Sequence, residues 1–506
     1  MAVGTMISLG LYFLVMLGIG WYSFKESDTN VEGYMLGGRK LGPAVTALSA
    51  GASDMSGWML MGLPGAMYVA GISAMWIAVG LTIGAFANYI LVAPRLRVYT
   101  EIANNAITLP DYFENRFADN SRMLRVIASV VIVIFFTLYT SSGVVAGGKL
   151  FESSFNLSYE LGLYVTAGVV VAYTLIGGFM AVSMTDFVQG CIMFLSLILV
   201  PIVVIMNLGG LSDANAIITD INPNLFALFT DASTNTALST IGIISLLAWG
   251  LGYFGQPHII VRFMAIRSVK EVPVARRIGM SWMIMSIIGA LFTGLYGMAY
   301  VSQQDGVSID PETIFIYLSQ LLFHPLIGGF LLAAILAAIM STISSQLLVT
   351  SSSLTSDFYQ VFLRKDASEK ELVIAGRISV IVVAAVAIAL AYDRDSTILS
   401  LVSNAWAGFG AAFGPLVIFS LFDRHMTRAA AFAGMITGAV TVLLWIYLPI
   451  TIGGQSLSAW MYEIVPGFIL SSIAIVVVSK ITQPRENVKE TFEKFEEALH
   501  HQQNVI

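Results

Sequence analysis

Long apolar stretches, separated by short polar or glycine-rich segments, follow one another along almost the whole chain. An α-helix needs about 20 predominantly apolar residues to cross a bilayer, so each stretch predicts one membrane-spanning helix. The pattern therefore predicts an all-α integral membrane protein with about thirteen transmembrane helices. We expect these helices near residues 5–23, 41–70, 74–93, 124–147, 160–181, 187–207, 236–256, 278–302, 313–350, 378–392, 398–421, 429–450 and 457–479.

Composition agrees with a membrane setting. Charged residues make up 11% of the 506 residues and the mean hydropathy is +0.82, whereas ordinary soluble domains carry about 25% charged residues. The lone Cys191 excludes an internal disulfide and a cysteine-based zinc site. The sequence has no nucleotide-binding loop, and its five histidines form no metal-ligand pattern. We expect a protein that is not an enzyme, has no cofactor and binds no nucleic acid.

The positions of the basic residues predict how the helices are oriented. All but two of the 25 Lys and Arg residues fall in alternate loops, and basic loops stay on the cytoplasmic side. We therefore expect the N-terminus outside and the C-terminus in the cytoplasm, which requires an odd number of spans. The expected organisation is a transmembrane domain over 1–482, followed by a charged, helical cytoplasmic tail over 483–506.

A polar, glycine-containing run at 49–58 interrupts the apolar stretch 41–70 and carries the carboxylate of Asp54. An ionised side chain near the centre of a bilayer costs roughly 2.5 to 3.5 kcal/mol, so such residues usually face a cavity and serve ions or substrates. Small residues on both sides allow the backbone to unwind and to offer its carbonyls to a cation. Secondary transporters build binding sites from helices that are broken in this way.

A second interruption lies at 247–258, where three glycines and Pro257 fall in an otherwise apolar span, five predicted helices after the first. Two interrupted helices that open successive five-helix units are typical of a binding site between inverted repeats. The alternative is that the glycines only permit close helix packing. Trp249 and Tyr253 point into one cavity if this segment stays helical, and they flank the break if it unwinds.

A third candidate is a hydroxyl-bearing helix face in the span 313–350. At helical spacing Ala338, Ser341 and Thr342 share one face. Two hydroxyl oxygens and a backbone carbonyl are hard ligands of the kind that Na⁺ accepts. The alternative is that both hydroxyls bond to their own backbone one turn earlier.

Distinctive motifs occur at residues 36–43, 46–58, 62–66, 173–179, 249–258 and 405–415. These motifs resemble those of the sodium/solute symporter family, and within it those of the proline carriers, over nearly the whole chain. Two local departures are visible. Asn156 stands where the family usually has Gly or Ser, and Ser345 stands where proline carriers often have Cys.

The resemblance implies a leucine-transporter-like core of five plus five helices in inverted repeat, over about residues 41–421 of the transporter domain. It implies a multi-pass symporter of the cell membrane that imports L-proline by alternating access, with Na⁺ as the co-transported ion and the only metal. The alternatives are a relative for another small solute, such as pantothenate, a carboxylate or a sugar, a transporter-like membrane sensor, and a passive channel. It implies no particular oligomeric state.

The resemblance also assigns roles to residues near the first break and on the hydroxyl face. The sodium ligands would be the backbone carbonyls of Ala52, Met55 and Ala338 and the hydroxyls of Ser341 and Thr342. The residues that match positions coupling sodium to proline are Asp54, Ser56 and Gly57. The Asp54 carboxylate is either a direct sodium ligand, or it acts from outside the ligand shell through its electric field and its hydrogen bonds.

Further roles follow for aromatic and charged residues. The substrate-binding positions would be Tyr139, Trp249 and Tyr253, whose rings would pack on the pyrrolidine ring of proline. For each, ordinary aromatic packing is the alternative. The possible gate or ion-path residues are Asp186, Arg39 and Arg377. An aspartate that opens a span is also an ordinary helix cap, and the positive-inside pattern alone accounts for both arginines.

Overall fold

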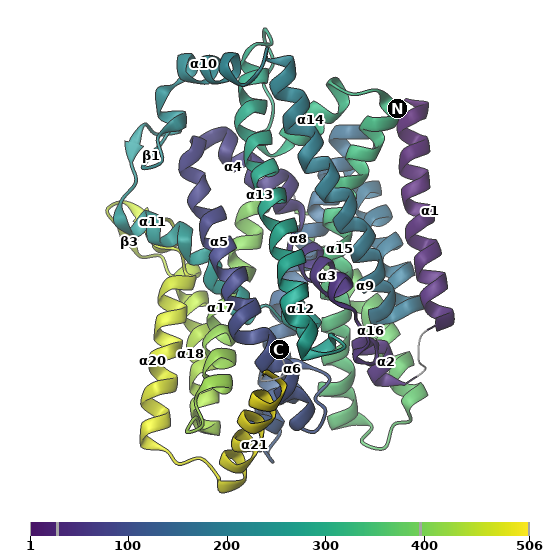
Figure 1. Cartoon of the computed structure of the whole chain (residues 1–506), viewed down its shortest axis with the longest axis vertical. Coiled ribbons are helices and arrows are strands. Elements are labelled where there is room, and N and C mark those ends of the chain that lie inside the picture. The colour runs from purple at the N-terminus through teal and green to yellow at the C-terminus, as the bar shows by residue number, and fades with distance from the viewer. Residues whose placement is uncertain (1, 27–29, 394–396, 504–506) are drawn as a thin grey trace.

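The computed structural model describes residues 2–26, 30–393 and 397–503, and 83% of the chain is helical. Most helices stand side by side along the longest axis of the molecule (Figure 1). The α-helices are α1 (Val3–Glu26), α2 (Val31–Leu36), α3 (Pro43–Asp54), α4 (Leu63–Ala70), α5 (Met75–Ala87), α6 (Ala93–Ile102), α7 (Leu109–Arg116), α8 (Met123–Phe155), α9 (Tyr159–Asn207), α10 (Leu211–Ile221), α11 (Thr240–Leu247), α12 (Pro257–Ala265), α13 (Val272–Ser302), α14 (Ile314–Leu321), α15 (Pro325–Ser352), α16 (Glu369–Leu390), α17 (Ile398–Phe422), α18 (Arg428–Tyr447), α19 (Leu457–Trp460), α20 (Ile464–Ile481) and α21 (Glu486–Gln503).

Shorter elements connect or interrupt these helices. The 3₁₀ segments are η1 (Gly37–Arg39), η3 (Gly71–Ala74), η5 (Pro223–Phe226), η6 (Ala248–Gly255), η7 (Val269–Glu271) and η8 (Pro311–Thr313). The π-helical segments are η2 (Trp58–Gly62), η4 (Asn88–Val92) and η9 (Ser353–Leu363). The strands form two small antiparallel hairpins, β1 (Thr230–Asp231) with β2 (Thr236–Ala237) and β3 (Thr451–Ile452) with β4 (Gln455–Ser456).

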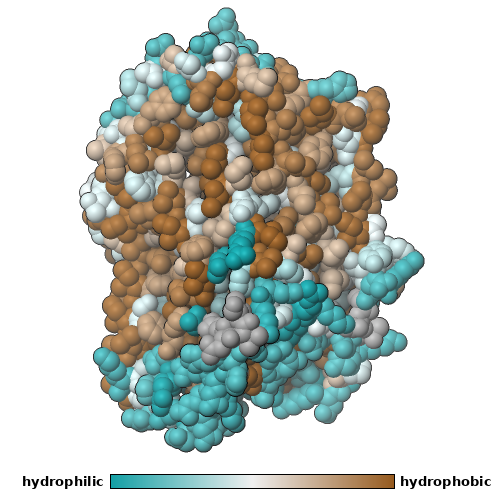
Figure 2. Space-filling view, viewed as in Figure 1, coloured by the Kyte–Doolittle hydropathy of each residue, from teal (hydrophilic) through white to brown (hydrophobic). Residues whose placement is uncertain are grey.

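The surface of the bundle is that of a membrane protein. Within the described residues, ten helical segments are long and apolar enough to cross a bilayer. Figure 2 shows hydrophobic side chains over the middle of the visible face and hydrophilic side chains at its ends, most densely at the lower end, where α21 lies. Helices that satisfy their own backbone polar groups and expose apolar side chains can span lipid. The chain is therefore a multi-pass helical membrane protein, as the sequence predicts.

These ten segments differ in number from the thirteen predicted spans because several breaks do not end a helix. The predicted spans at 160–181 and 187–207 form the single element α9, which turns at Gly178. Gly178 has φ 58° and ψ −146°, a conformation that glycine adopts far more readily than other residues. The predicted span at 236–256 is divided between α11 and η6, which together form a shorter apolar helix of Thr240–Gly255.

The centre of the bundle is formed by α15 and α17. Of the ten membrane-spanning segments, those that contain α15 and α17 are the most deeply buried. The helix α15 contacts α1, α3, α8, α9 and α12, while α17 contacts α8, η6, α18 and α20. This packing brings the broken segments α3–η2 and η6–α12 against the hydroxyl-bearing face of α15.

The C-terminal helix α21 packs against the rest of the chain. Phe492 and Phe495 are each 1% exposed, and their ring centroids lie 6.0 and 4.6 Å from that of Tyr99 in α6. The guanidinium of Arg116 lies 5.0 Å from the centroid of the Phe492 ring. The predicted tail is thus helical, with one apolar face packed and a charged face exposed.

Candidate functional site

The helix α3 ends at Asp54, and the backbone then leaves the helical path. The amide of Met55 donates to the Gly51 carbonyl at 2.8 Å, but the amide of Ser56 donates to the Asp54 carbonyl at 2.9 Å. In an unbroken α-helix that amide would bond to Ala52. The break therefore releases the Ala52 carbonyl from the helix.

A hydroxyl from α15 meets the released carbonyl. The Ser341 hydroxyl donates to the Ala52 carbonyl oxygen at 2.6 Å and lies 3.1 Å from the Ala338 carbonyl oxygen. The Thr342 hydroxyl donates to the same Ala338 oxygen at 3.2 Å. Bonding of both hydroxyls to their own helix, the alternative reading of the sequence, does occur, but it does not account for the contact between α15 and α3. Four of the five predicted sodium ligands therefore converge at one point.

The remaining residues of the first break surround this point. The carbonyl of Met55 lies in the broken stretch. In a continuous helix it would accept from the amide of Met59, but that amide donates to the Ser56 carbonyl at 3.1 Å. Gly57 lies against α8 and α15, because a Cβ added there would lie 3.3 Å from Ala146 and 3.7 Å from Ile339. The predicted coupling positions Ser56 and Gly57 thus lie at the interface between the break and its neighbours.

The Asp54 carboxylate points to the second broken helix. It is 2% exposed, and its Oδ2 accepts a short hydrogen bond from the Tyr253 hydroxyl. Its Oδ1 has no hydrogen-bond partner among the described residues. Both side chains line a small cavity of about 30 Å³, which is large enough for a water molecule. The carboxylate therefore lies with the aromatic residues rather than with the Ser341 and Thr342 hydroxyls.

Trp249 and Tyr253 face different cavities. The segment η6 is a 3₁₀-helix, and residues four apart in such a helix lie about 120° apart around its axis, against about 40° in an α-helix. Tyr253 meets Trp406 edge to face at 5.1 Å, while Trp249 stacks on Tyr462 at 5.2 Å. Trp249, but not Tyr253, lines a cavity of about 470 Å³. Neither predicted geometry is observed, because the helix tightens at 248–255 and breaks only at Gln256.

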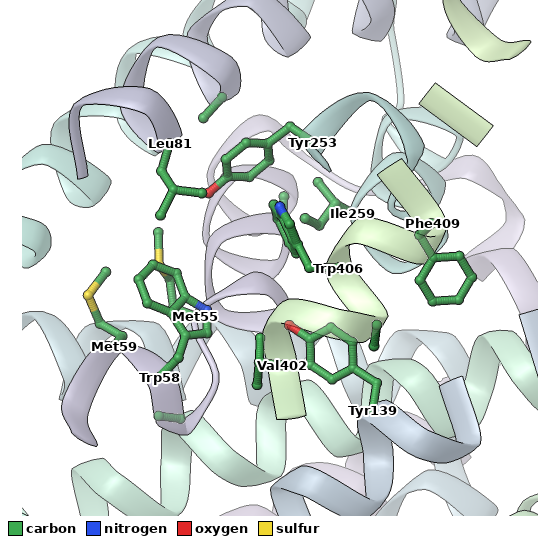
Figure 3. Close-up of a cluster of buried hydrophobic side chains, with 14 of the residues drawn as sticks. Met55, Trp58, Met59, Leu81, Tyr139, Tyr253, Ile259, Val402, Trp406 and Phe409 are labelled. Atoms are coloured by element: carbon green, nitrogen blue, oxygen red, sulfur yellow. The ribbon is translucent and has the colours of Figure 1, made fainter. Parts of the chain in front are cut away.

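Tyr139 completes the aromatic cluster. Figure 3 shows Tyr139 of α8 among the buried side chains that also include Tyr253, Trp406, Met55 and Trp58. The Tyr139 side chain is 1% exposed. The cluster thus brings together two of the three predicted substrate-binding residues and the residue that follows Asp54.

The glycines of η6 do permit close packing, which was the alternative reading of the second break. A Cβ added at Gly250 would lie 2.1 Å from the Gly80 carbonyl oxygen of α5, and one at Gly252 would lie 1.9 Å from the Trp406 indole nitrogen. Contacts this short exclude a side chain. Close packing and a broken helix therefore occur together, and the packing fixes where the aromatic side chains point.

Asp186 does not open a helix, so its interpretation as an ordinary cap is wrong. It lies inside α9, because the turn that divides this element is at Gly178. Its Oδ2 accepts from the Ser49 hydroxyl at 2.8 Å and lies 3.2 Å from Nη2 of Arg262, and both charged side chains are fully buried. The same Nη2 donates to the Ser345 hydroxyl at 2.7 Å, and Ser345 donates to the Ser341 carbonyl at 2.8 Å. A continuous chain of hydrogen bonds thus joins the ion pair to the predicted sodium ligands.

Arg39 and Arg377 lie apart from this ion pair. Arg39 donates to the carbonyls of Met264 and Ala106 at 2.6 and 2.7 Å. Burial, together with the neighbouring positive charge of Arg97, lowers the pKa of Arg39 to about 10. Arg377 donates to the Leu175 carbonyl at 2.9 Å and lies over the ring of Tyr34.

Two further buried polar residues border the cluster, and the sequence analysis missed them. His258 is fully buried, and neither ring nitrogen has a hydrogen-bond partner among the described residues. Its ring centroid lies 5.8 Å from that of Tyr139. Gln346 accepts from Thr140 at 3.0 Å, and its Nε2 likewise has no described partner. Buried polar groups are normally hydrogen-bonded. The sequence signal that could have identified His258 is its position directly after Pro257, at a helix break.

Two broken helices that meet a hydroxyl-bearing helix in a membrane bundle define a secondary transporter, built from discontinuous helices. The profile of the Sodium:solute symporter family matches residues 34–438. The chain belongs to this family. It is accordingly a transporter rather than an enzyme, with Na⁺ as a co-transported ion.

Curated relatives match along nearly their full length. The osmoregulated proline transporter OpuE of Bacillus subtilis is 58% identical over 484 residues, which cover 96% of each chain. The high-affinity proline transporter PutP of the same organism is 56% identical, over 96% of this chain and 100% of the relative. A sodium/proline symporter of Staphylococcus aureus is also 56% identical, over 95% of this chain and 93% of the relative.

Solved structures show the same fold at low sequence identity. The substrate-bound, outward-open state of a Na⁺-coupled sialic acid symporter superposes with a TM-score of 0.79 at 20% identity, over 96% of this chain and 99% of that one. The nucleobase-cation-symport-1 transporter Mhp1, closed around bromovinylhydantoin, gives a TM-score of 0.56 at 12% identity, over 91% and 98%. The chain therefore has the leucine-transporter-like fold.

Proposed function

We propose that this protein imports L-proline together with Na⁺ across the cytoplasmic membrane by alternating access. The curated relatives, which are 56–58% identical over nearly their full length, carry names that specify proline transport. The observation that carries the proposal is the contact of the Ser341 hydroxyl with the Ala52 carbonyl at 2.6 Å. It joins a hydroxyl-bearing helix to a broken helix two residues before Asp54, which bonds to Tyr253.

In the proposed ion site, five oxygens from two helices bind Na⁺. The Ser341 and Thr342 hydroxyls turn their protons away from the backbone, so that their oxygens face the ion together with the carbonyls of Ala52, Met55 and Ala338. An ion held in this way bridges α3 and α15. Sodium then favours the conformation in which these helices meet, and a ligand shifts an equilibrium only through such a difference in affinity.

In the proposed substrate site, proline lies between Asp54 and the aromatic cluster. Tyr139 and Tyr253 pack on the pyrrolidine ring, and Asp54, which accepts from Tyr253 and whose Oδ1 has no partner among the described residues, couples the solute to sodium. The cavity of about 30 Å³ beside Asp54 must widen to admit the substrate. Ser56 and Gly57 transmit this movement to the ion site, because they follow Asp54 and the Met55 ligand in the same broken stretch.

We further propose a number of membrane spans, domain bounds and an orientation for the chain. The ten continuous segments become thirteen spans when the breaks between α4 and α5 and within α9 are counted and the shorter apolar helix Thr240–Gly255 is added. The inverted-repeat core covers about 41–421 of a transporter domain at 1–482, and residues 483–506 form a cytoplasmic tail with the N-terminus outside. Asp186 acts as a gate or ion-path residue, as do Arg39 and Arg377 on the cytoplasmic side.

The proposal is tested by uptake of labelled L-proline into proteoliposomes with and without an inward Na⁺ gradient. A tenfold gradient supplies roughly 1.4 kcal/mol and a potential of 100 mV about 2.3 kcal/mol, so one ion per substrate supports accumulation on the order of several hundredfold. Uptake that ignores the gradient indicates a passive channel. Absence of labelled proline uptake, together with Na⁺-driven uptake of labelled pantothenate or sugar by the same proteoliposomes, overturns the substrate assignment.

A further inference from the structure

A groove opens on the surface of the bundle between α9 and α13. Its volume is about 640 Å³, and its lining includes the apolar side chains of Phe194, Leu195, Ile278 and Met285. Both helices belong to segments that are long and apolar enough to cross a bilayer. Leu195 and Met285 are exposed, so in a membrane the groove is open to lipid.

The floor of the groove reaches α3. Leu48 of α3 and Trp282 of α13 both line the groove and are otherwise buried. The Trp282 indole donates to the Gly190 carbonyl of α9 at 2.8 Å. Its ring also lies against Gly51 of α3, where an added Cβ would be 2.6 Å from Trp282 Cζ3. Gly51 lies one helical turn before Asp54, so a molecule in the groove rests on the helix whose end forms the first break.

One stretch of α13 separates the groove from the small cavity beside Asp54. The residues of α13 that line the groove, apart from its charged end, are Ile278, Ser281, Trp282 and Met285. The residues of the same stretch that line the cavity beside Asp54 are Gly279, Met280 and Met283. Successive residues of a helix point in different directions, so these two sets lie on different faces of α13. Contacts in the groove therefore restrain a helix that also borders the proposed substrate site.

The groove is positively charged at one end. The one charged residue among its described lining residues is Arg277, which is exposed and whose guanidinium has no hydrogen bond or ion pair to another described residue. The neighbouring arginines have partners, since Arg267 pairs with Glu271 and Arg276 lies over the ring of Phe86. Arg277 is near the start of α13, at the end of the bundle where α21 lies, because η7 directly precedes α13 and contacts α21.

We propose that this groove binds an anionic phospholipid of the membrane, with the phosphate at Arg277 and one acyl chain over Trp282 and Leu48. A guanidinium presents several donors to a phosphate, and basic residues at the end of a membrane span attract anionic headgroups. The apolar lining beyond Arg277 fits an acyl chain and gives a soluble anion no further donor except the Ser281 hydroxyl. A lipid bound in this way holds α3 against α13 and α9, and so favours the conformation in which α3 carries the proposed ion ligands.

Photo-crosslinking tests occupancy directly. The full-length protein is reconstituted into vesicles of phosphatidylethanolamine and phosphatidylglycerol in equal parts, with a trace of phosphatidylglycerol that carries a diazirine on its acyl chain. Crosslinks should fall on the groove-lining residues of α9 and α13. Their yield should decrease about fivefold in Arg277→Gln, which is the contribution of one basic residue to binding at an anionic leaflet. The matched variant Arg276→Gln loses the same charge at a position that does not line the groove, and it should crosslink as the wild type does.

Three outcomes would overturn the lipid site. The first is an equal yield in Arg277→Gln and Arg276→Gln, and the second is an equal yield from a phosphatidylcholine probe. The third uses the lone cysteine, Cys191, which lines the groove. If a bis-maleimide joins Cys191 of two copies of the chain while lipid crosslinks are missing, the groove is an interface between copies.

Sodium dependence tests the effect of the lipid on transport, and this effect rests on the proposed function. In the vesicles with phosphatidylglycerol, Arg277→Gln should raise the half-saturating Na⁺ concentration for proline uptake up to about fivefold relative to Arg276→Gln. With phosphatidylcholine in its place, the two variants should be equal. Comparing variants within one lipid composition removes the effect of the surface potential on the local Na⁺ concentration.

The two tests separate the lipid site from the proposed function. If the wild type shows no Na⁺-dependent proline uptake, the proposed function fails, while crosslinking still decides whether the lipid binds. If uptake is normal but the two variants have the same Na⁺ dependence with phosphatidylglycerol, the action of the lipid on α3 is overturned.

Discussion

The two broken helices differ in what their breaks provide. At the first break, α3 ends and the backbone provides the chemistry, because the freed Ala52 carbonyl meets the Ser341 hydroxyl at 2.6 Å. At the second, the backbone tightens into η6, and glycines pressed against α5 and α17 direct aromatic side chains to two cavities. Changes at the first break should therefore act on sodium, and changes at the second on the solute.

One ion pair connects the two breaks. Arg262 follows the second break on α12, and it bonds to Ser49 of α3 at 3.0 Å, to Ser345 of α15 at 2.7 Å and to Asp186 of α9. A single buried guanidinium thus holds four helices. Movement of either broken helix would strain these bonds, which offers a physical route for coupling.

Breaking this ion pair should have the largest effect. Asp186→Asn leaves the buried Arg262 charge uncompensated, which costs about 3 to 5 kcal/mol of stability. Thermal unfolding of the purified protein in detergent should shift to clearly lower temperature. The double variant Asp186→Asn with Arg262→Met should recover most of the loss, because no isolated charge remains. An Asp186→Asn variant that unfolds at the wild-type temperature would show that the pair does not hold the helices together.

Neutralising Asp54 should have the next largest effect. Asp54→Asn keeps the volume but removes a charged hydrogen-bond acceptor, and such a bond contributes about 1.5 to 3 kcal/mol. Sodium-dependent uptake should fall by about ten- to hundredfold, or the half-saturating Na⁺ concentration should rise. Asp220→Asn on exposed α10 is the control for charge alone. Near-normal Na⁺ dependence in correctly inserted Asp54→Asn would remove Asp54 from the coupling mechanism.

Substitutions in η6 should act on the solute first. Removing a buried aromatic contact is worth a few kcal/mol at most, so Trp249→Ala and Tyr253→Ala should each raise the KM for proline by about one to two orders of magnitude. Tyr253→Phe keeps the ring and loses only the bond to Asp54, so it should add a sodium effect through linkage, whereas Trp249→Phe should not. Sodium binding is measured without proline alongside uptake. Variants that lose this binding yet keep wild-type proline affinity would contradict the division between the two breaks.

The local distribution of small and polar residues predicted the first break well. Small residues around Asp54 indicated unwinding, and the spacing of Ser341 and Thr342 indicated a hydroxyl face. Both signals are local, because they depend on neighbours within one or two helical turns. The sequence could not reveal that the Ser341 hydroxyl reaches Ala52, since that contact depends on how α3 and α15 pack.

The second break depends on distant parts of the chain. Trp249 and Tyr253 point apart because η6 winds as a 3₁₀-helix, whose glycines lie in close contact with α5 and α17, and no local pattern specifies those contacts. Asp186 was placed at the start of a span because the real turn, at Gly178, lies eight residues earlier within one long element. Tyr462 was not considered at all, since it lies outside the predicted core.

The smallest effects should come from single oxygens of the hydroxyl face. Ser341→Ala and Thr342→Ala each remove one proposed ligand and one hydrogen bond, which is worth about 1 kcal/mol, so the half-saturating Na⁺ concentration should rise about fivefold. Thr342→Ser keeps the oxygen and should have less effect. Ser351→Ala is the matched control, because this buried hydroxyl of the same helix donates to its own backbone at Leu348, at 3.0 Å. If uptake by Ser341→Ala and Thr342→Ala depends on Na⁺ just as uptake by Ser351→Ala does, these hydroxyls serve only to bond to the helix backbone. The proposed difference between the breaks, that the first binds the ion and the second does not, then fails.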